Sequence, residues 1–148
     1  MDNLFPIGSL ENITLKDKQY KVFKGSYAFD FQAGEFIKNS DGSIKKVNDF
    51  ESYIQWCQKA MMTARFKYMA YSSKFGEEGN NIIGSILDDK AIELEIKRIT
   101  TEALIVHSRT EGVENFRFNW KNGEVNYDYE IITIYEERKV LNNTMKVR

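Results

Sequence analysis

Three residue types are almost missing from this 148-residue chain, which has one cysteine, one histidine and one proline. The single cysteine, Cys57, cannot form a disulfide within the chain, which fits a reducing compartment. Because Cys57 and His107 stand at unrelated positions, the sequence predicts no cluster of metal ligands, and nothing in it indicates a cofactor. With Pro6 as the only proline, Pro-rich linkers are excluded.

Long apolar runs and an excess of one charge are also missing. No stretch approaches the roughly 18 consecutive apolar residues of a membrane-spanning helix. The first residues lack the basic start and apolar run of a signal peptide. Lys and Arg number 21 and Asp and Glu number 22, so the net charge is −1. The basic residues are interspersed rather than clustered, and we therefore expect no nucleic-acid partner and no membrane partner.

Apolar and aromatic residues are abundant. They make up 42% and 14% of the chain, which indicates one folded domain with a sizeable core. The patterns divide the chain into an N-terminal arm (1–19), a single domain (20–135) and a C-terminal tail or strand arm (136–148). The arm is either a frayed terminus or a segment that docks on a partner. The tail is either disordered or pairs with the edge of a neighbour's sheet.

The first half of the domain has the pattern of a small antiparallel unit followed by a helix. Residues 20–47 alternate between apolar and polar side chains, with tight turns predicted at Gly34 and Gly42. A capping box at 48–51 then opens a helix. Apolar residues at helical spacing predict that this helix has a buried face and runs to about Phe66.

A second helical region follows. Residues 79–87 are predicted to form a short helix, and Asp88 is predicted to cap a longer one that ends near Ile105. His107 then lies in a loop. No constellation of Ser, Cys or Asp supports a catalytic role for this histidine.

The last third of the chain is rich in aromatic and β-branched residues. Asn122-Gly123, between two such runs, is a strong hairpin signal. The return strand is predicted over 125–135, with Ile132 and Ile134 making its second side apolar at the far end. A strand that is apolar on both sides is usually covered on both faces, and we expect this of its far end.

The centre of the chain, Thr63–Gly84, places Arg65 ahead of Phe75, Gly76 and Glu78. Gly76 can adopt a left-handed conformation, and the guanidinium of Arg65 can bind a carboxylate or a row of carbonyl oxygens. Two interpretations stay open at this point. Arg65 and Glu78 are either surface charges in an ordinary loop or a buried ion pair that clamps the two helices. Removing one partner of a buried pair would cost about 3–5 kcal/mol.

A set of motifs occurs in fixed order along the chain: Phe29-Asp30-Phe31-x-x-Gly34-Glu35, Trp56, Thr63-x-Arg65, Tyr71-Ser72, Phe75-Gly76-x-Glu78 and Ile82-Ile83-Gly84. In this order and spacing the set resembles a family of baseplate proteins from contractile-tailed phages and phage-like bacteriocins. These are the small wedge components called sheath initiators, similar to the lysozyme-like wedge family of myoviruses. The resemblance covers about residues 27–135.

The resemblance implies an α+β fold, with two main helices on one side of a mostly antiparallel sheet and a C-terminal β-hairpin. It implies a structural protein without catalysis, located in the virion at the tail baseplate and assembled in the bacterial cytoplasm. The implied partners are the sheath protein and baseplate wedge proteins, with the tail tube or hub as further candidates. A small regulatory adaptor on the same fold and a cell-wall hydrolase are the alternatives.

Two sets of site residues follow from the resemblance. Sheath strands would extend the C-terminal β region, and deletion of 124–148 would leave baseplates without sheath. The family's Arg-centred motif implies a contact with wedge proteins, in competition with the internal clamp; its residues here are Arg65, Phe75, Gly76 and Glu78. The implied sheath contacts are Val125, Tyr127, Tyr129, Ile131, Ile132, Thr133, Ile134 and Tyr135.

Overall fold

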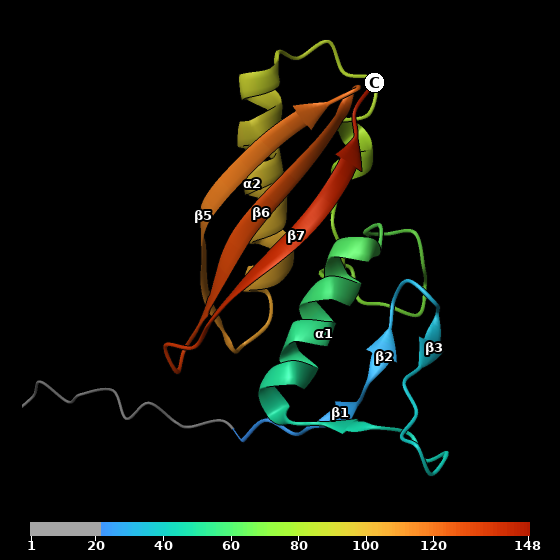
Figure 1. Cartoon of the computed structure of the whole chain (residues 1–148). Helices are drawn as coiled ribbons and strands as arrows, with labels where there is room; N and C mark the ends of the chain where they lie inside the picture. The colour runs from blue at the N-terminus through green and yellow to red at the C-terminus, as the bar shows by residue number, and fades with distance from the viewer. Residues whose placement is uncertain (1–21) are drawn as a thin grey trace, which may run out of the picture.

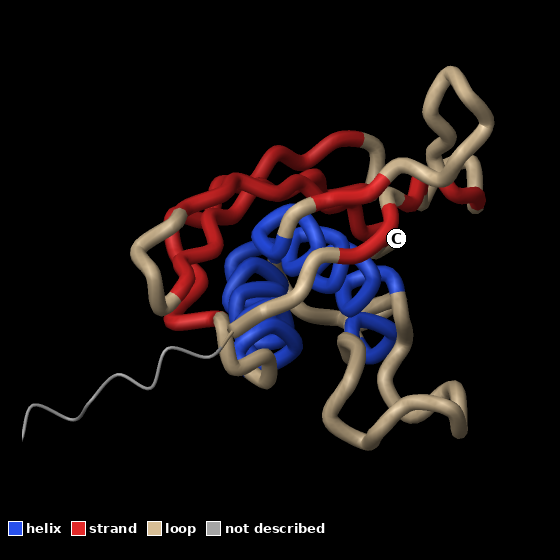
Figure 2. Tube along the Cα trace, turned by 90° about the horizontal axis from the view of Figure 1, so that it is seen from below, coloured by secondary structure: helices blue, strands red, loops and turns tan. Residues whose placement is uncertain are grey.

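The computed structural model describes residues 22–148, so the arm expected at 1–19 lies outside the described residues. Two helices, α1 (Asp49–Met62) and α2 (Asp89–Ile105), cover one face of a three-stranded antiparallel sheet (Figure 1). Figure 2 shows the helices gathered beneath this sheet. This arrangement confirms the predicted α+β class. In spatial order, the strands are β5 (Thr110–Lys121), β6 (Glu124–Thr133) and β7 (Arg138–Lys146).

The N-terminal part of the described chain forms a small antiparallel unit beside α1. Gly34 and Gly42 have φ angles of 74° and 85°, which most side chains resist. Gln55 of α1 holds the unit in place, since its side chain accepts a bond from Phe29 N (2.6 Å) and donates one to Tyr27 O (3.1 Å). The strand pairs are β1 (Ser26–Tyr27) with β4 (Lys46–Val47) and β2 (Phe29–Asp30) with β3 (Glu35–Phe36).

Helix α1 begins at the predicted capping box, and both of its bonds are formed. Asn48 Oδ1 accepts from Glu51 N at 2.8 Å, and Glu51 Oε2 accepts from Asn48 N at 3.4 Å. The helix ends at Met62, before the predicted end near Phe66. The reason is local: Thr63 is extended, and Phe66 has a φ of 64°. The buried residues of the helix are Tyr53, Cys57, Ala60 and Met61.

Helix α2 is capped by Asp88 as predicted, with Asp88 Oδ1 accepting from Ala91 N at 3.0 Å. The prediction of a short helix over 79–87 is wrong, because the helical part of this segment is a single 3-10 turn, η1 (Gly79–Asn81). Gly84 has a φ of 72°, a conformation that ends a helix. Within residues 22–148, no helix is both long and apolar enough to span a membrane.

The C-terminal sheet closes the core. Asn122 and Gly123 have φ angles of 52° and 77°, which suit the tight hairpin turn between β5 and β6. Residues 138–146, assigned from the sequence to a tail or strand arm, form β7 and pair with β6 over nine positions. The sheet residues in the buried core are Val125, Tyr127, Tyr129, Ile131 and Leu141, and Val147 joins them just after β7.

Candidate functional site

β6, the strand in which the resemblance implied most of the sheath contacts, lies in the middle of the sheet. β6 pairs with β5 on one side and with β7 on the other. Its main-chain groups are therefore used within the domain. Ile134 and Tyr135, in the turn that follows β6, are half-buried. The remaining residues of that set are buried in the domain: Val125, Tyr127, Tyr129, Ile131, Ile132 and Thr133.

The open edge of the sheet belongs to β7. Two main-chain bonds bracket the β6–β7 ladder: Val147 N donates to Gly123 O, and Thr133 N donates to Glu137 O, both at 3.0 Å. The register does not shift between them. Because bonded and non-bonded pairs alternate in an antiparallel ladder, the odd-numbered residues of β7 bond to β6 and the even-numbered residues point away.

We call this outward side of β7 the open edge. Its main-chain N–H and C=O groups make no hydrogen bond within the part of the chain that the structure describes. Five such positions in a regular strand can template an added strand. They are Arg138, Val140, Asn142, Thr144 and Lys146.

The opposite edge of the sheet, on β5, is less suited to pairing. The β5–β6 register shifts between Thr110 and Gly112 and again between Glu114 and Arg117. Asn115, within the second shift, has a φ of 55°. Such bulges bend a strand and interrupt its edge. β7, which has no shift, is therefore the better platform for another strand.

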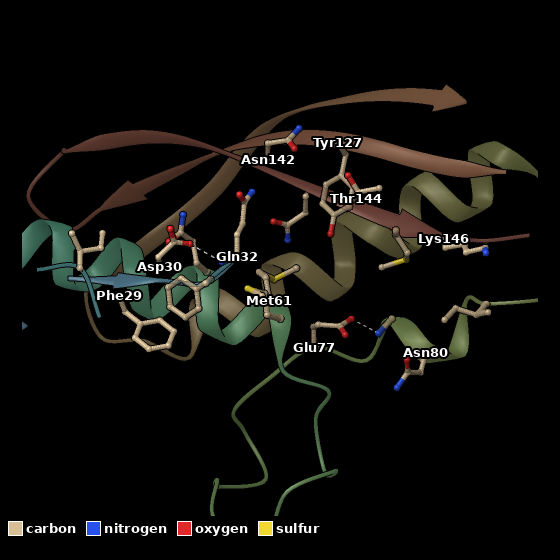
Figure 3. Close-up of a pocket in the computed structure, with 18 residues that line it drawn as sticks. Phe29, Asp30, Gln32, Met61, Glu77, Asn80, Tyr127, Asn142, Thr144 and Lys146 are labelled. Carbon is tan, nitrogen blue, oxygen red and sulfur yellow. Dashed lines mark hydrogen bonds between the residues drawn. The ribbon is translucent and has the colours of Figure 1, made fainter. Parts of the chain in front are cut away.

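A groove of about 830 Å³ runs beside the open edge. Figure 3 shows Asn142 and Thr144 of β7 on one side of it, with Met61 and Glu77 on the other. Phe29 and neighbouring residues of the N-terminal unit close one end. The groove therefore combines exposed polar main chain on one wall with apolar side chains on the other.

Two carboxylates line this groove. Asp30 accepts bonds from Gln32 N (2.8 Å) and Ala33 N (3.1 Å). Glu77 accepts a bond from Gly79 N. Burial raises the pKa of Glu77 above its ordinary value, although the Gly79 bond and the charge of Arg65 act in the opposite direction. Within the described residues, no Lys or Arg lies within salt-bridge distance of either carboxylate.

Arg65 closes the base of an adjoining loop, residues 65–76, which we call the clamp loop. Its Nη1 lies 3.0 Å from Glu78 Oε1, and its Nε donates to Gly76 O at 3.1 Å. Main-chain bonds from Arg65 N to Glu77 O (2.8 Å) and from Glu77 N to Thr63 O (2.9 Å) complete the closure. The side chains of Arg65 and Glu78 are 13% and 30% exposed, so the pair is partly buried.

The other members of the Arg-centred motif also make internal contacts. Gly76 is buried with a φ of 103°, and a Cβ there would collide with Thr63 O. The Phe75 ring lies 5.6 Å from Trp56 and 4.7 Å from Tyr71. The motif thus fixes the shape of the clamp loop, and the residues that reach solvent are at its tip. The exposed large apolar residues of the clamp loop are Phe66, Tyr68, Met69 and Tyr71.

The structure also contains a buried arginine cluster that was not predicted from the sequence. Arg109 is 1% exposed and pairs with Asp49 at 3.0 Å and with Glu137 at 2.8 Å. His107 lies 4.5 Å from Trp56, ring to ring, and its pKa is lowered by burial and by Arg109. The rings around the Arg109 guanidinium, at 5.1–5.6 Å, are Phe23, Phe50, Tyr53 and Tyr135.

No local signal could have revealed this cluster. The partners of Arg109 lie 60 and 28 residues away in sequence, at the start of α1 and in the turn before β7. The cluster joins three segments and makes no catalytic constellation. Within residues 22–148, no three His, Cys, Asp or Glu side chains gather closely enough to hold a metal ion.

These features define a class of protein: a small α+β domain with a regular open sheet edge beside a groove. Comparison with known families makes the identification specific. Residues 25–136, most of the chain, match the family of contractile injection system sheath initiators, and the chain belongs to that family. A search of curated proteins finds no match.

Membership confirms the resemblance drawn from the ordered motifs. It makes the chain a structural component of a contractile injection system and implies interaction with sheath and baseplate components in a tail or baseplate assembly. The matched region ends at residue 136, just before β7 begins at Arg138. The open edge therefore lies just beyond the matched residues.

Proposed function

We propose that this chain starts sheath assembly at the baseplate by accepting an extended strand of a sheath subunit along the open edge. The observation that carries the proposal is the row of unpaired main-chain groups on β7. This row lies beside a groove that is lined by both polar and apolar side chains. Main-chain bonds would supply affinity and register, and the groove would supply specificity. This role requires no catalysis, and the particle would be assembled in the bacterial cytoplasm.

The proposal shifts the expected contact from β6 to its neighbour. Residues 125–135 act indirectly, because the β6 side chains support the sheet on which β7 lies. Deleting 124–148 would remove the central strand and part of the core, so loss of sheath in that deletion would not identify the contact. A substitution confined to the open edge is the sharper test.

Asn142→Pro provides that test. Proline removes one outward N–H and places its ring in the path of an added strand, but an edge strand tolerates it where the N–H points to solvent. Asn143→Pro is the matched control for folding, because that N–H points to β6 and proline there removes a ladder hydrogen bond of the sheet. Asn142→Ala controls for the side chain, which donates to Asp128 at 2.6 Å.

We expect Asn142→Pro to fold, to enter baseplates and to yield particles without sheath when tails are counted by electron microscopy. Asn142→Ala should yield sheathed tails, and Asn143→Pro should unfold at a lower urea concentration than Asn142→Pro. Normal sheathed tails from a folded Asn142→Pro chain would overturn strand addition at β7.

We also propose that the clamp loop contacts a wedge protein. Arg65 and Glu78 hold the loop, and its exposed tip offers aromatic and Met side chains of the kind that dominate interfaces. No Asp or Glu occurs in residues 52–76, whereas Lys67 and Lys74 flank the tip. A wedge surface that is apolar with an acidic rim would complement it.

A further inference from the structure

The charged residues that line the groove beside the open edge are Asp30, Glu77 and Lys146, and neither carboxylate forms an ion pair within the described residues. These charges restrict what can lie in the groove. Resting on the proposed function, we infer that the groove selects a sheath strand that carries a lysine or arginine opposite Glu77, with apolar side chains flanking it on the same face. This basic residue would make binding depend on the sequence of the added strand as well as on its main-chain hydrogen bonds.

The dimensions and walls of the groove fit such a strand. Residues 142–146 of β7 all line it, and a strand laid along five residues spans about 17 Å. Alternate side chains of that strand would point toward the helices. There they meet Met61, Met62 and Ile83. Methionine side chains adapt to apolar partners of different shape, so the flanking positions need only be apolar.

The charge is placed where an added strand would pass. A Cβ at Gly79 would collide with both the Glu77 carboxylate and the Met145 side chain, so these two groups meet around Gly79 beneath the end of β7. Figure 3 shows Glu77 below Thr144. The absence of a side chain at Gly79 leaves this corner to the carboxylate.

Burial makes Glu77 the stronger of the two acidic determinants. Its carboxylate accepts only the Gly79 bond among the described residues, so it retains acceptor capacity for a cation. The rise of its pKa reflects the cost of holding this charge away from water. A basic side chain from the partner would offset that cost, whereas an acidic one would add to it. Asp30 is exposed and already accepts two main-chain bonds, so its contribution is smaller.

The experiment measures binding of the purified sheath subunit from the same particle to the full-length chain by biolayer interferometry. Glu77→Gln keeps an acceptor for Gly79 N but removes the charge, so it should fold. Glu114→Gln, on exposed β5, is the matched control. We expect Glu77→Gln to weaken binding about tenfold, equivalent to about 1.4 kcal/mol. Raising the salt from about 0.15 M to about 0.5 M should weaken the unaltered chain more than Glu77→Gln.

The outcomes separate this inference from the function on which it rests. If Asn142→Pro abolishes binding but Glu77→Gln has unchanged affinity and salt dependence, the edge accepts a strand without reading its charge, and the inference fails. If Asn142→Pro binds normally, the proposed function itself fails. If the chain alone shows a mass that rises with concentration and is lowered by Glu77→Gln, a second copy occupies the groove, which also overturns the inference.

Discussion

Replacing Arg65 with methionine tests whether the clamp loop is held from within. The change removes the bond to Gly76 O (3.1 Å) and the ion pair with Glu78 (3.0 Å) while keeping a long apolar stem. The charged guanidinium is the donor in both bonds, and a hydrogen bond to a charged group contributes about 1.5–3 kcal/mol before any replacement by water. Glu78 is 30% exposed, so water can partly replace the lost guanidinium. We therefore expect a loss of about 2–3 kcal/mol, below the 3–5 kcal/mol typical of a fully buried pair.

Urea unfolding of the full chain measures this loss as a shift of the midpoint at unchanged slope. Arg98→Met is the matched control, because Arg98 also forms ion pairs, here with Glu95 and Glu102, but is 45% exposed on α2. That substitution should cost less than about 1 kcal/mol. If Arg65→Met costs no more than Arg98→Met, Arg65 does not hold the loop, and its side chain is available for a partner instead.

Two further predictions concern the edge and the arginine cluster. In amide hydrogen exchange followed by NMR, Asn143 and Met145 should exchange at least about tenfold more slowly than Asn142 and Thr144, because only the odd-numbered amides bond to β6. Uniformly slow exchange would mean that something already covers the open edge. Burial and Arg109 lower the pKa of His107, so between pH of about 7 and about 5.5 the unfolded chain binds a proton that the folded chain does not, and stability should fall as the pH drops. In urea unfolding, His107→Gln should show a smaller fall over this range, and an equal fall would show that other groups control it.

The sequence predicted those parts of the fold that depend on near neighbours. The capping box needs only Asn48 and Glu51, and the β5–β6 hairpin needs only Asn122 and Gly123, so both were recognisable from spacing. The order of the motifs along the chain also indicated the family correctly. The short helix over 79–87 failed because periodicity cannot show that Gly84 adopts a left-handed conformation.

The parts that depend on distant partners were harder. β7 alternates weakly, with Asn143 among its inward positions, so nothing in its own residues separates a paired strand from a polar tail. Because β7 lies beside β6 and forms the edge of the sheet, the candidate sheath contact is on β7 and not on β6. Arg109 was equally hidden, since its carboxylates come from opposite ends of the domain. The sequence does not show which strands are neighbours, and it therefore cannot show which edge of the sheet stays open.

The way β7 is held explains how an open edge can be kept ready for a partner. Just before the strand, Glu137 is bound by Arg109 and by the Thr133 hydroxyl. Just after it, Val147 bonds to Gly123, and its carbonyl accepts from Gly84 N at 3.0 Å. Fixed at both ends, β7 loses little further freedom when another strand pairs with it, which favours binding. Two basic residues along it, Lys139 and Lys146, form no ion pair within the described residues and oppose pairing with a second copy of the same edge. The same edge is thus disfavoured for self-association and preorganised for a strand of different composition.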